Sequence, residues 1–142
     1  GSADLWVPGK SCLTTSGNCS SKKPYDRAAS STYSEVPHGS RSVFNIMYGS
    51  GAVSGKFALE TVTVAEDYSV EGQTFAHVDS TDGLGELYEK AKFDGILGLA
   101  FPRISQDPGV NTYIANLNGQ AGVDAVVAFY LGNDADGELA IG

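Results

Sequence analysis

The sequence predicts a predominantly β domain with one or two short helices. Short apolar stretches alternate along the chain with Gly, Ser, Asn and Asp, the residue types that end strands in turns. The 18 glycines suit frequent turns, and a hydrophobic content of 42% over 142 residues is enough for the core of one domain. No repeat and no linker divides the chain, so we expect a single domain over residues 1–142.

The charge balance argues against two classes of partner. Nine Lys and Arg against seventeen Asp and Glu give a net charge of −8, which repels phosphate backbones and anionic lipid headgroups. No run of about 18 apolar residues would span a bilayer, and the first residues lack the pattern of a signal peptide. We expect no nucleic-acid partner and no membrane partner, and a mature or internal segment.

Two cysteines, Cys12 and Cys19, bear on the compartment. They stand in a stretch rich in Ser, Gly and Lys, without the histidines or further cysteines that a zinc site needs. A small disulfide loop is favoured, and two unrelated free thiols are the alternative. Because such a bond persists only in oxidising surroundings, we expect a protein outside the cytosol.

A long β-hairpin is predicted over about residues 42–65. Residues 42–48 (SVFNIMY) mix β-branched and aromatic side chains, as strands do. Residues 49–51 (GSG) supply the backbone freedom that a tight turn needs. Residues 56–65 (KFALETVTVA) then alternate two sets of side chains between the faces of a returning strand.

Further strands and short helices complete the prediction. Strands are expected at residues 5–7, 70–78, 93–101, 126–131 and 138–141. Helices are expected at residues 85–92 and from an Asn111-Thr112 cap to a stop at Gly119. The two glycines inside the apolar segment 93–101 suit a strand that passes closely beside another backbone.

Several segments resemble, in order, the amino-terminal lobe of pepsin-like aspartic proteases. Residues 1–8 (GSADLWVP) look like the continuation of that family's Asp-Thr-Gly-Ser active-site motif, and the family places a small disulfide where the two cysteines stand. Residues 30–33 (SSTY) are similar to another family segment, and residues 48–51 (YGSG) resemble the tip of its substrate-covering flap. Residues 93–100 (FDGILGLA) resemble the element that threads behind the catalytic loop. Five segments in one order make the resemblance specific, and it covers the whole chain.

The resemblance implies one lobe of the pepsin-like acid protease fold and part of an aspartic-type endopeptidase. In that family each lobe contributes one aspartate, and the two carboxylates share a proton because like charges at close range do not both ionise cheaply. The pair activates a water molecule that attacks the peptide carbonyl. The implied partners are a peptide or protein substrate and the second lobe or remaining chain segments, with no cofactor and no metal. The implied location is extracellular, secreted or vacuolar-lysosomal.

Neither catalytic aspartate is expected among these residues. The sequence begins at the glycine of the expected motif, so the aspartate would lie before Gly1, and no Asp-Thr-Gly or Asp-Ser-Gly occurs later. Asp94 lies in an apolar, glycine-rich segment, but it lacks the carboxylate partner that the dyad needs, and the resemblance gives it a structural place. We therefore expect an active parent enzyme, of which the isolated chain is an inactive fragment.

Other function classes stay open. A catalytically inactive family member would serve as a binding or inhibitor module, or as a structural lobe in a larger assembly, since fold alone does not decide function. A serine hydrolase is disfavoured because Ser2 lacks a Gly-x-Ser-x-Gly context and only His38 and His77 are available as a base. Two scattered histidines do not make a metal site either.

The resemblance also assigns supporting roles around the cleft. Ser2 would orient the missing aspartate through a hydrogen bond, with a plain turn serine as the alternative. Tyr48 would cover the cleft from the flap tip, with Trp6 as its structural partner beneath. Gly49, Ser50 and Gly51 would let the flap bend, and backbone groups there would pair with an extended peptide.

Three apolar residues complete the expected substrate-binding set. Leu87, Phe93 and Ile96 align with positions that line a hydrophobic substrate pocket in the family. Packing in the core is the alternative for each, because apolar side chains are buried more often than they line clefts.

Overall fold

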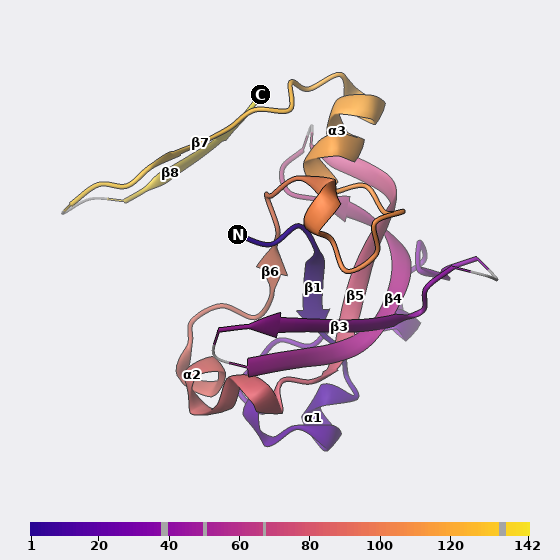
Figure 1. Cartoon of the computed structure of the whole chain (residues 1–142), viewed down its shortest axis with the longest axis vertical. Helices are drawn as coiled ribbons and strands as arrows, with labels where there is room; N and C mark the ends of the chain where they lie inside the picture. Colours follow the sequence, from indigo (N-terminus) through magenta and orange to yellow (C-terminus); the bar gives the residue numbers. More distant parts are fainter. Residues whose placement is uncertain (38–39, 50, 67, 134–135) are drawn as a thin grey trace.

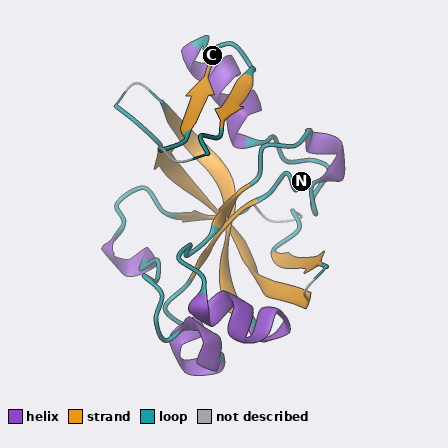
Figure 2. Cartoon of the chain, turned by 90° about the vertical axis from the view of Figure 1, so that its left-hand side faces the viewer, coloured by secondary structure: helices purple, strands orange, loops and turns teal. Residues whose placement is uncertain are grey.

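The chain folds mainly into strands, and its helices lie around the margins of one twisted sheet (Figures 1 and 2). The computed structural model describes residues 1–37, 40–49, 51–66, 68–133 and 136–142. The strands are β1 Leu5–Pro8, β2 Ser34–Glu35, β3 Val43–Tyr48, β4 Gly51–Thr63, β5 Ser69–Ser80, β6 Ile96–Leu97, β7 Val127–Tyr130 and β8 Glu138–Ile141. The helices are α1 Cys12–Thr15, α2 Gly85–Lys90 and α3 Tyr113–Ala121, with 3-10 turns at Gly17–Cys19, Arg27–Ala29, Asp82–Leu84 and Pro102–Ile104. The predicted fold class is confirmed.

Six strands form the main sheet, with neighbours in the order β2-β4-β5-β1-β6 and β3 paired with the other end of β4. β1 runs parallel to β5, with Trp6 opposite Ala76, while β6 is antiparallel to β1. β7 and β8 form a separate hairpin that extends away from this sheet in Figure 1. No helix among the described residues is long and apolar enough to cross a membrane.

The predicted hairpin is present as β3 and β4, with Tyr48 opposite Gly51 next to the turn. The alternation in β3 buries Phe44 and Ile46 and exposes the residues between and beside them. β4 begins directly after the turn, earlier than the pattern from residue 56 predicted. The hairpin is therefore anchored to the core by one face, with its tip at Tyr48.

Several predicted element bounds were wrong: α2 ends at Lys90 rather than at residue 92, and two segments that contain glycines differ more. The strand expected at residues 93–101 is reduced to β6, because its glycines thread against the backbone of β1: a Cβ at Gly95 would lie 2.2 Å from the carbonyl oxygen of Trp6. The helix that starts at Thr112 does not stop at Gly119 but runs to Ala121, where Gly122 adopts a left-handed φ of 69°. The close backbone passage itself was predicted correctly. β2 and α1 were missed, since two and four residues carry too little pattern.

Two clusters of buried side chains form the core. The first lies around Trp6 and includes Phe44, Val53, Phe57, Val78, Tyr88 and both cysteines. The second lies under α3 and consists of Val70, Tyr113, Ile114 and Leu117. The first cluster supports the hairpin and α2, the two elements that surround the candidate site.

A buried carboxylate holds the segment 30–33. Glu60 on β4 accepts hydrogen bonds from the hydroxyl of Tyr25 (2.5 Å), from Ser30 Oγ (2.6 Å) and from Thr32 Oγ1. Burial raises the pKa of Glu60, but these hydrogen bonds and one from the amide of Thr61 together bring the pKa below its ordinary value. The serine-rich segment is thus fastened to the sheet through one side chain.

The predicted disulfide between Cys12 and Cys19 is present, and both residues are fully buried. We expect the double variant Cys12→Ser/Cys19→Ser to lower the free energy of unfolding by about 2.5 kcal/mol, because a loop this short restricts the unfolded chain by that amount. Urea denaturation of wild type with and without reductant measures the same quantity. Equal stability of oxidised and reduced wild type would contradict the expectation, and the double variant, which reductant should not affect, is the control.

Candidate active-site cleft

Two adjoining hollows share Tyr48 and Ile96. The first, which we call the apolar hollow, has a volume of about 170 Å³ and is lined by Tyr48, Leu84, Leu87, Tyr88, Phe93 and Ile96. The second, which we call the Ser2 hollow, has a volume of about 470 Å³ and is lined by Gly1, Ser2, Ile46, Met47, Tyr48, Ile96, Ile104 and Gln106. Tyr48, at the tip of the β3–β4 hairpin, belongs to both.

Tyr48 is held in place by Trp6. The indole Nε1 of Trp6 donates a hydrogen bond of 2.8 Å to the hydroxyl of Tyr48. Trp6 is fully buried on β1, where its ring packs on that of Tyr88 with 6.0 Å between centroids. A buried indole N–H needs an acceptor, and the tyrosine hydroxyl supplies it. The tip of the hairpin is therefore tied to the centre of the sheet.

Four of the predicted substrate-binding residues come together in the apolar hollow: Tyr48, Leu87, Phe93 and Ile96. Leu87 is 68% exposed and Phe93 46% exposed, which argues against the alternative that they are core residues. Their part in substrate binding stays a prediction.

Sequence analysis missed Leu84 and Tyr88 in the wall of this hollow. Their spacing of four residues, with Leu87 beside them, is the helical spacing that would have found them. Burial, with the charge of Asp94 added, raises the pKa of Tyr88 to about 12. Its hydroxyl therefore stays protonated and donates to the carbonyl oxygen of Asp94 at 2.6 Å.

Ser2 and Gly49, two further predicted residues, do not line the apolar hollow. Ser2 lines the Ser2 hollow, and its carbonyl oxygen accepts a hydrogen bond of 3.0 Å from the amide of Ala100. Gly49 is exposed in the turn next to Tyr48, and a Cβ there would meet no atom within 4 Å. Ser50 and His38 lie outside the described residues.

Asp94 lines neither hollow. Its carboxylate Oδ1 accepts a hydrogen bond of 3.2 Å from the backbone amide of Lys23. Among the described residues, no group of three or more His, Cys, Asp or Glu is placed to hold a metal ion.

A buried carboxylate beneath the Ser2 hollow was also missed. Asp4 is 5% exposed and its Oδ1 accepts hydrogen bonds from Ser105 Oγ (2.7 Å) and the amide of Gln106 (3.2 Å). Arg41 Nη1 donates to the carbonyl oxygen of Gln106 at 2.9 Å. Both backbone groups of Gln106, which lines the hollow, are thus satisfied by distant side chains. No local pattern signals such contacts.

The eukaryotic aspartyl protease family matches residues 1–142, the whole chain. The chain belongs to this family. Its strand-rich architecture is one lobe of the pepsin-like fold, as the resemblance implied.

Three similar proteins are named cathepsin D or probable vacuolar protease A. This aspartyl protease chain is 39% identical over 147 residues to cathepsin D of Chionodraco hamatus, with 100% of the chain and 35% of that relative covered. It is 37% identical over 143 residues to a probable vacuolar protease A of Arthroderma benhamiae, covering 99% of the chain and 33% of that relative. It is 45% identical over 105 residues to cathepsin D of Dictyostelium discoideum, covering 74% of the chain and 26% of that relative. The aspartyl protease chain thus spans about a third of the length of the first two relatives.

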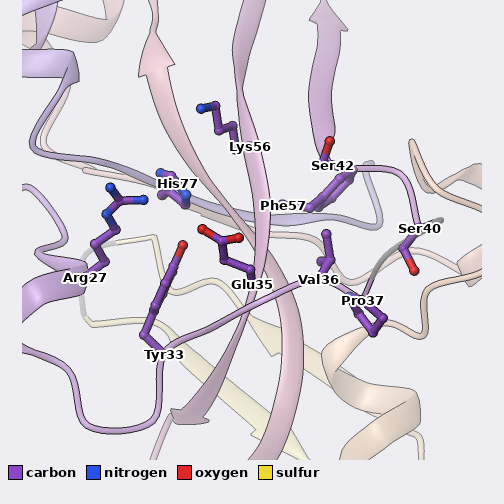
Figure 3. A pocket seen from close by; sticks show the side chains of 10 residues that line it. All are labelled: Arg27, Tyr33, Glu35, Val36, Pro37, Ser40, Ser42, Lys56, Phe57 and His77. Carbon is purple, nitrogen blue, oxygen red and sulfur yellow. The ribbon is translucent and has the colours of Figure 1, made fainter.

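A third, more polar hollow of the aspartyl protease chain has a volume of about 370 Å³. Figure 3 shows Arg27, Tyr33, Glu35 and His77 gathered on one side of it. None of the predicted site residues lines it. His77 is 8% exposed, and burial lowers its pKa; Arg27 and Lys56 lower it further, while Asp79 opposes them.

We expect His77→Gln to remove part of the loss of stability in mild acid. Because the folded pKa of His77 lies below the unfolded value of about 6.5, the unfolded chain takes up a proton first as the pH falls. His77 therefore contributes a destabilisation that begins near pH 6.5 and grows toward its folded pKa. Free energies of unfolding at about pH 7.5 and 5.5 measure it.

The expected result is a smaller difference between the two pH values in the variant than in wild type. Glu60 does not confound the comparison, because a carboxyl whose pKa is lowered loses its stabilisation only as the pH falls below its ordinary pKa of 4.5. An equal pH dependence of variant and wild type would contradict the assignment to His77, whatever the absolute stability of the variant.

Proposed function

We propose that this chain is part of an aspartic endopeptidase that hydrolyses peptide bonds of peptide or protein substrates by a two-aspartate, activated-water mechanism. The observation that carries the proposal is Tyr48, held by Trp6 over two adjoining hollows of which one begins at Gly1-Ser2. Family membership supports the reaction class. Because the chain spans about a third of its relatives, the activity is proposed for the whole protein.

Within this chain the proposed roles are in binding and positioning. An extended peptide would lie under the tip of the hairpin and pair with its backbone, as in strand addition. The apolar hollow would accept an apolar side chain of the peptide, since all six of its lining residues are Leu, Ile, Phe or Tyr. Ser2 would donate a hydrogen bond to the carboxylate of the aspartate in the preceding motif position. Both catalytic aspartates would come from outside these 142 residues.

We also propose an oxidising location, either extracellular and secreted or vacuolar-lysosomal. The buried Cys12–Cys19 disulfide supports it, because such bonds persist outside the reducing cytosol. One relative carries the word vacuolar in its name.

The test begins with the sequence that adjoins Gly1 and Gly142 in the native protein. We expect Asp-Thr directly before Gly1 and a second Asp-Thr-Gly or Asp-Ser-Gly after Gly142. The full-length protein should then cleave peptides in acid, and replacing either of those aspartates by asparagine should abolish cleavage while peptide binding persists. The isolated 142 residues should show no cleavage.

A different residue in place of the first aspartate, with peptide binding retained, would replace the endopeptidase by the alternative of an inactive binding or inhibitor module. A full-length protein that neither cleaves nor binds peptides would leave the structural-lobe alternative.

A further inference from the structure

A buried lysine lies behind the apolar hollow. Lys22 is 7% exposed, although lysine is almost never fully buried unless its charge has a partner. Its Nζ donates hydrogen bonds to the carbonyl oxygens of Ala91 at 2.6 Å and Phe93 at 3.2 Å. The two ion pairs found among the described residues involve other lysines. The partners of this ammonium group are therefore backbone carbonyls.

The same ammonium group faces two aromatic rings of the hollow. Lys22 Nζ lies 4.5 Å from the ring centroid of Tyr88 and 5.9 Å from that of Phe93. The two rings pack edge to face with 5.8 Å between their centroids, and both line the apolar hollow. A cation over an aromatic face is attracted by the ring, most strongly where water is excluded. Lys22 thus contacts the wall from behind without lining the hollow.

The neighbours of Lys22 attach to the same stretch of chain. Ser21 Oγ donates to the carbonyl oxygen of Glu89 at 2.9 Å, in the last turn of α2, and the amide of Lys23 donates to Asp94 Oδ1 at 3.2 Å. The amide of Lys22 donates to the carbonyl oxygen of Cys19 at 3.0 Å. Residues 21–23 therefore join the disulfide loop to residues 89–94, which include Phe93 in the wall of the hollow.

We propose that Lys22 is a positioning residue that sets the shape of the apolar hollow and, with it, the selectivity for the substrate side chain that the hollow accepts. The inference rests on the proposed endopeptidase function. Phe93 is 46% exposed and lies outside any helix or strand, so little besides its carbonyl contact and its ring contacts orients it. Without the ammonium group, the carbonyl oxygens of Ala91 and Phe93 lose this donor, and the Phe93 ring loses its cationic neighbour but keeps the ring of Tyr88.

The experiment uses full-length protein with Lys22→Met, which keeps the apolar stem and removes the charge and the donors. Lys23→Met is the matched control: it removes the same charge one residue away, from an exposed side chain whose backbone, not ammonium group, makes the contact to Asp94. Two peptides that differ only in Phe or Ala at the position that enters the hollow serve as substrates.

We expect Lys22→Met to reduce the ratio of kcat/KM for the Phe peptide to that for the Ala peptide by about tenfold, a typical effect of a reshaped apolar pocket. Lys23→Met should leave the ratio as in wild type. If Lys22→Met fails to fold, Lys22→Gln replaces it in the test, because glutamine keeps an N–H donor without the charge. Lys22→Gln should reduce the same kcat/KM ratio by about threefold. An unchanged ratio in the folded Lys22 variant, or an equal change in the Lys23 variant, would overturn the inference.

A second measurement separates this inference from the proposed function. NMR spectra of the peptide-free proteins report the ring resonances of Tyr88 and Phe93 and the amide of Phe93. These should shift in the Lys22 variant and not in Lys23→Met. If wild type cleaves neither peptide, the endopeptidase proposal fails, and unshifted resonances would overturn the positioning role as well.

Discussion

Replacing Trp6 by alanine is expected to lower the free energy of unfolding by about 3 to 5 kcal/mol, the usual cost of truncating a large buried aromatic side chain. Trp6 is 0% exposed at the centre of the first core cluster, in contact with the ring of Tyr88. Its loss also removes the hydrogen bond to Tyr48 that ties down the tip of the hairpin. Urea denaturation followed by far-UV circular dichroism measures the change. Tryptophan fluorescence would not serve, because Trp6 is the one tryptophan of the sequence and the variant lacks it.

Two milder variants separate packing from hydrogen bonding. Trp6→Phe keeps an aromatic ring but has no N–H, and Tyr48→Phe removes the hydroxyl acceptor and leaves the buried indole N–H unpaired. Tyr48→Phe should therefore cost about 1 to 3 kcal/mol, and the double variant should cost less than the sum of the two single variants. Strictly additive costs would show that the two side chains are not coupled.

The second large effect is expected at Gly98, where alanine should lower the free energy of unfolding by about 3 kcal/mol or more. A Cβ at this position would lie 2.6 Å from the carbonyl oxygen of Ser2, 2.6 Å from the carbonyl carbon of Ala3 and 2.7 Å from the amide nitrogen of Asp4. All three are backbone atoms, so relief requires that the threaded segment and β1 separate. The amide of Gly98 donates to the carbonyl oxygen of Asp4 at 3.0 Å, and that bond would lengthen.

Gly119→Ala is a matched control, for which the expected change in the free energy of unfolding has the opposite sign. It lies inside α3, and a Cβ there would meet no atom within 4 Å. Because alanine is the better helix former and restricts the unfolded chain, Gly119→Ala should stabilise the protein by about 0.5 to 1 kcal/mol. Equal effects of alanine at both glycines would show that the close passage behind residues 2–4 does not constrain the fold.

The predictions that succeeded concern signals that lie within a few residues of each other. The β3–β4 hairpin, the disulfide loop and the Thr112 helix start each have their determinants in one short stretch. The candidate site was partly predictable: Leu87, Phe93 and Ile96 were named by resemblance and do line one hollow. Leu84 and Tyr88 follow from helical spacing once α2 is known.

The predictions that failed concern contacts between residues far apart in the sequence, and segments in which close backbone contact replaces strand pairing. The apolar run at 93–101 has the composition of a strand, but its glycines are used for close backbone contact with residues 2–7, which leaves only Ile96–Leu97 in the sheet. Asp4 and Lys22 are charged residues, for which a solvent-exposed position is the ordinary expectation. Their burial depends on acceptors and donors that the rest of the chain supplies.

The sequence by itself thus determined the fold class, the family and the elements whose patterns are local, because alternation, turn residues and caps act between close neighbours in the chain. Only the tertiary structure decided which side chains meet. Trp6 and Tyr48 are 42 residues apart, Lys22 and Phe93 are 71 apart, and Asp4 and Gln106 are 102 apart. These pairs are brought together by the parallel pairing of β1 with β5 and by the threading of residues 94–100 behind β1, and both involve the strand that carries Trp6, the centre of the first core cluster.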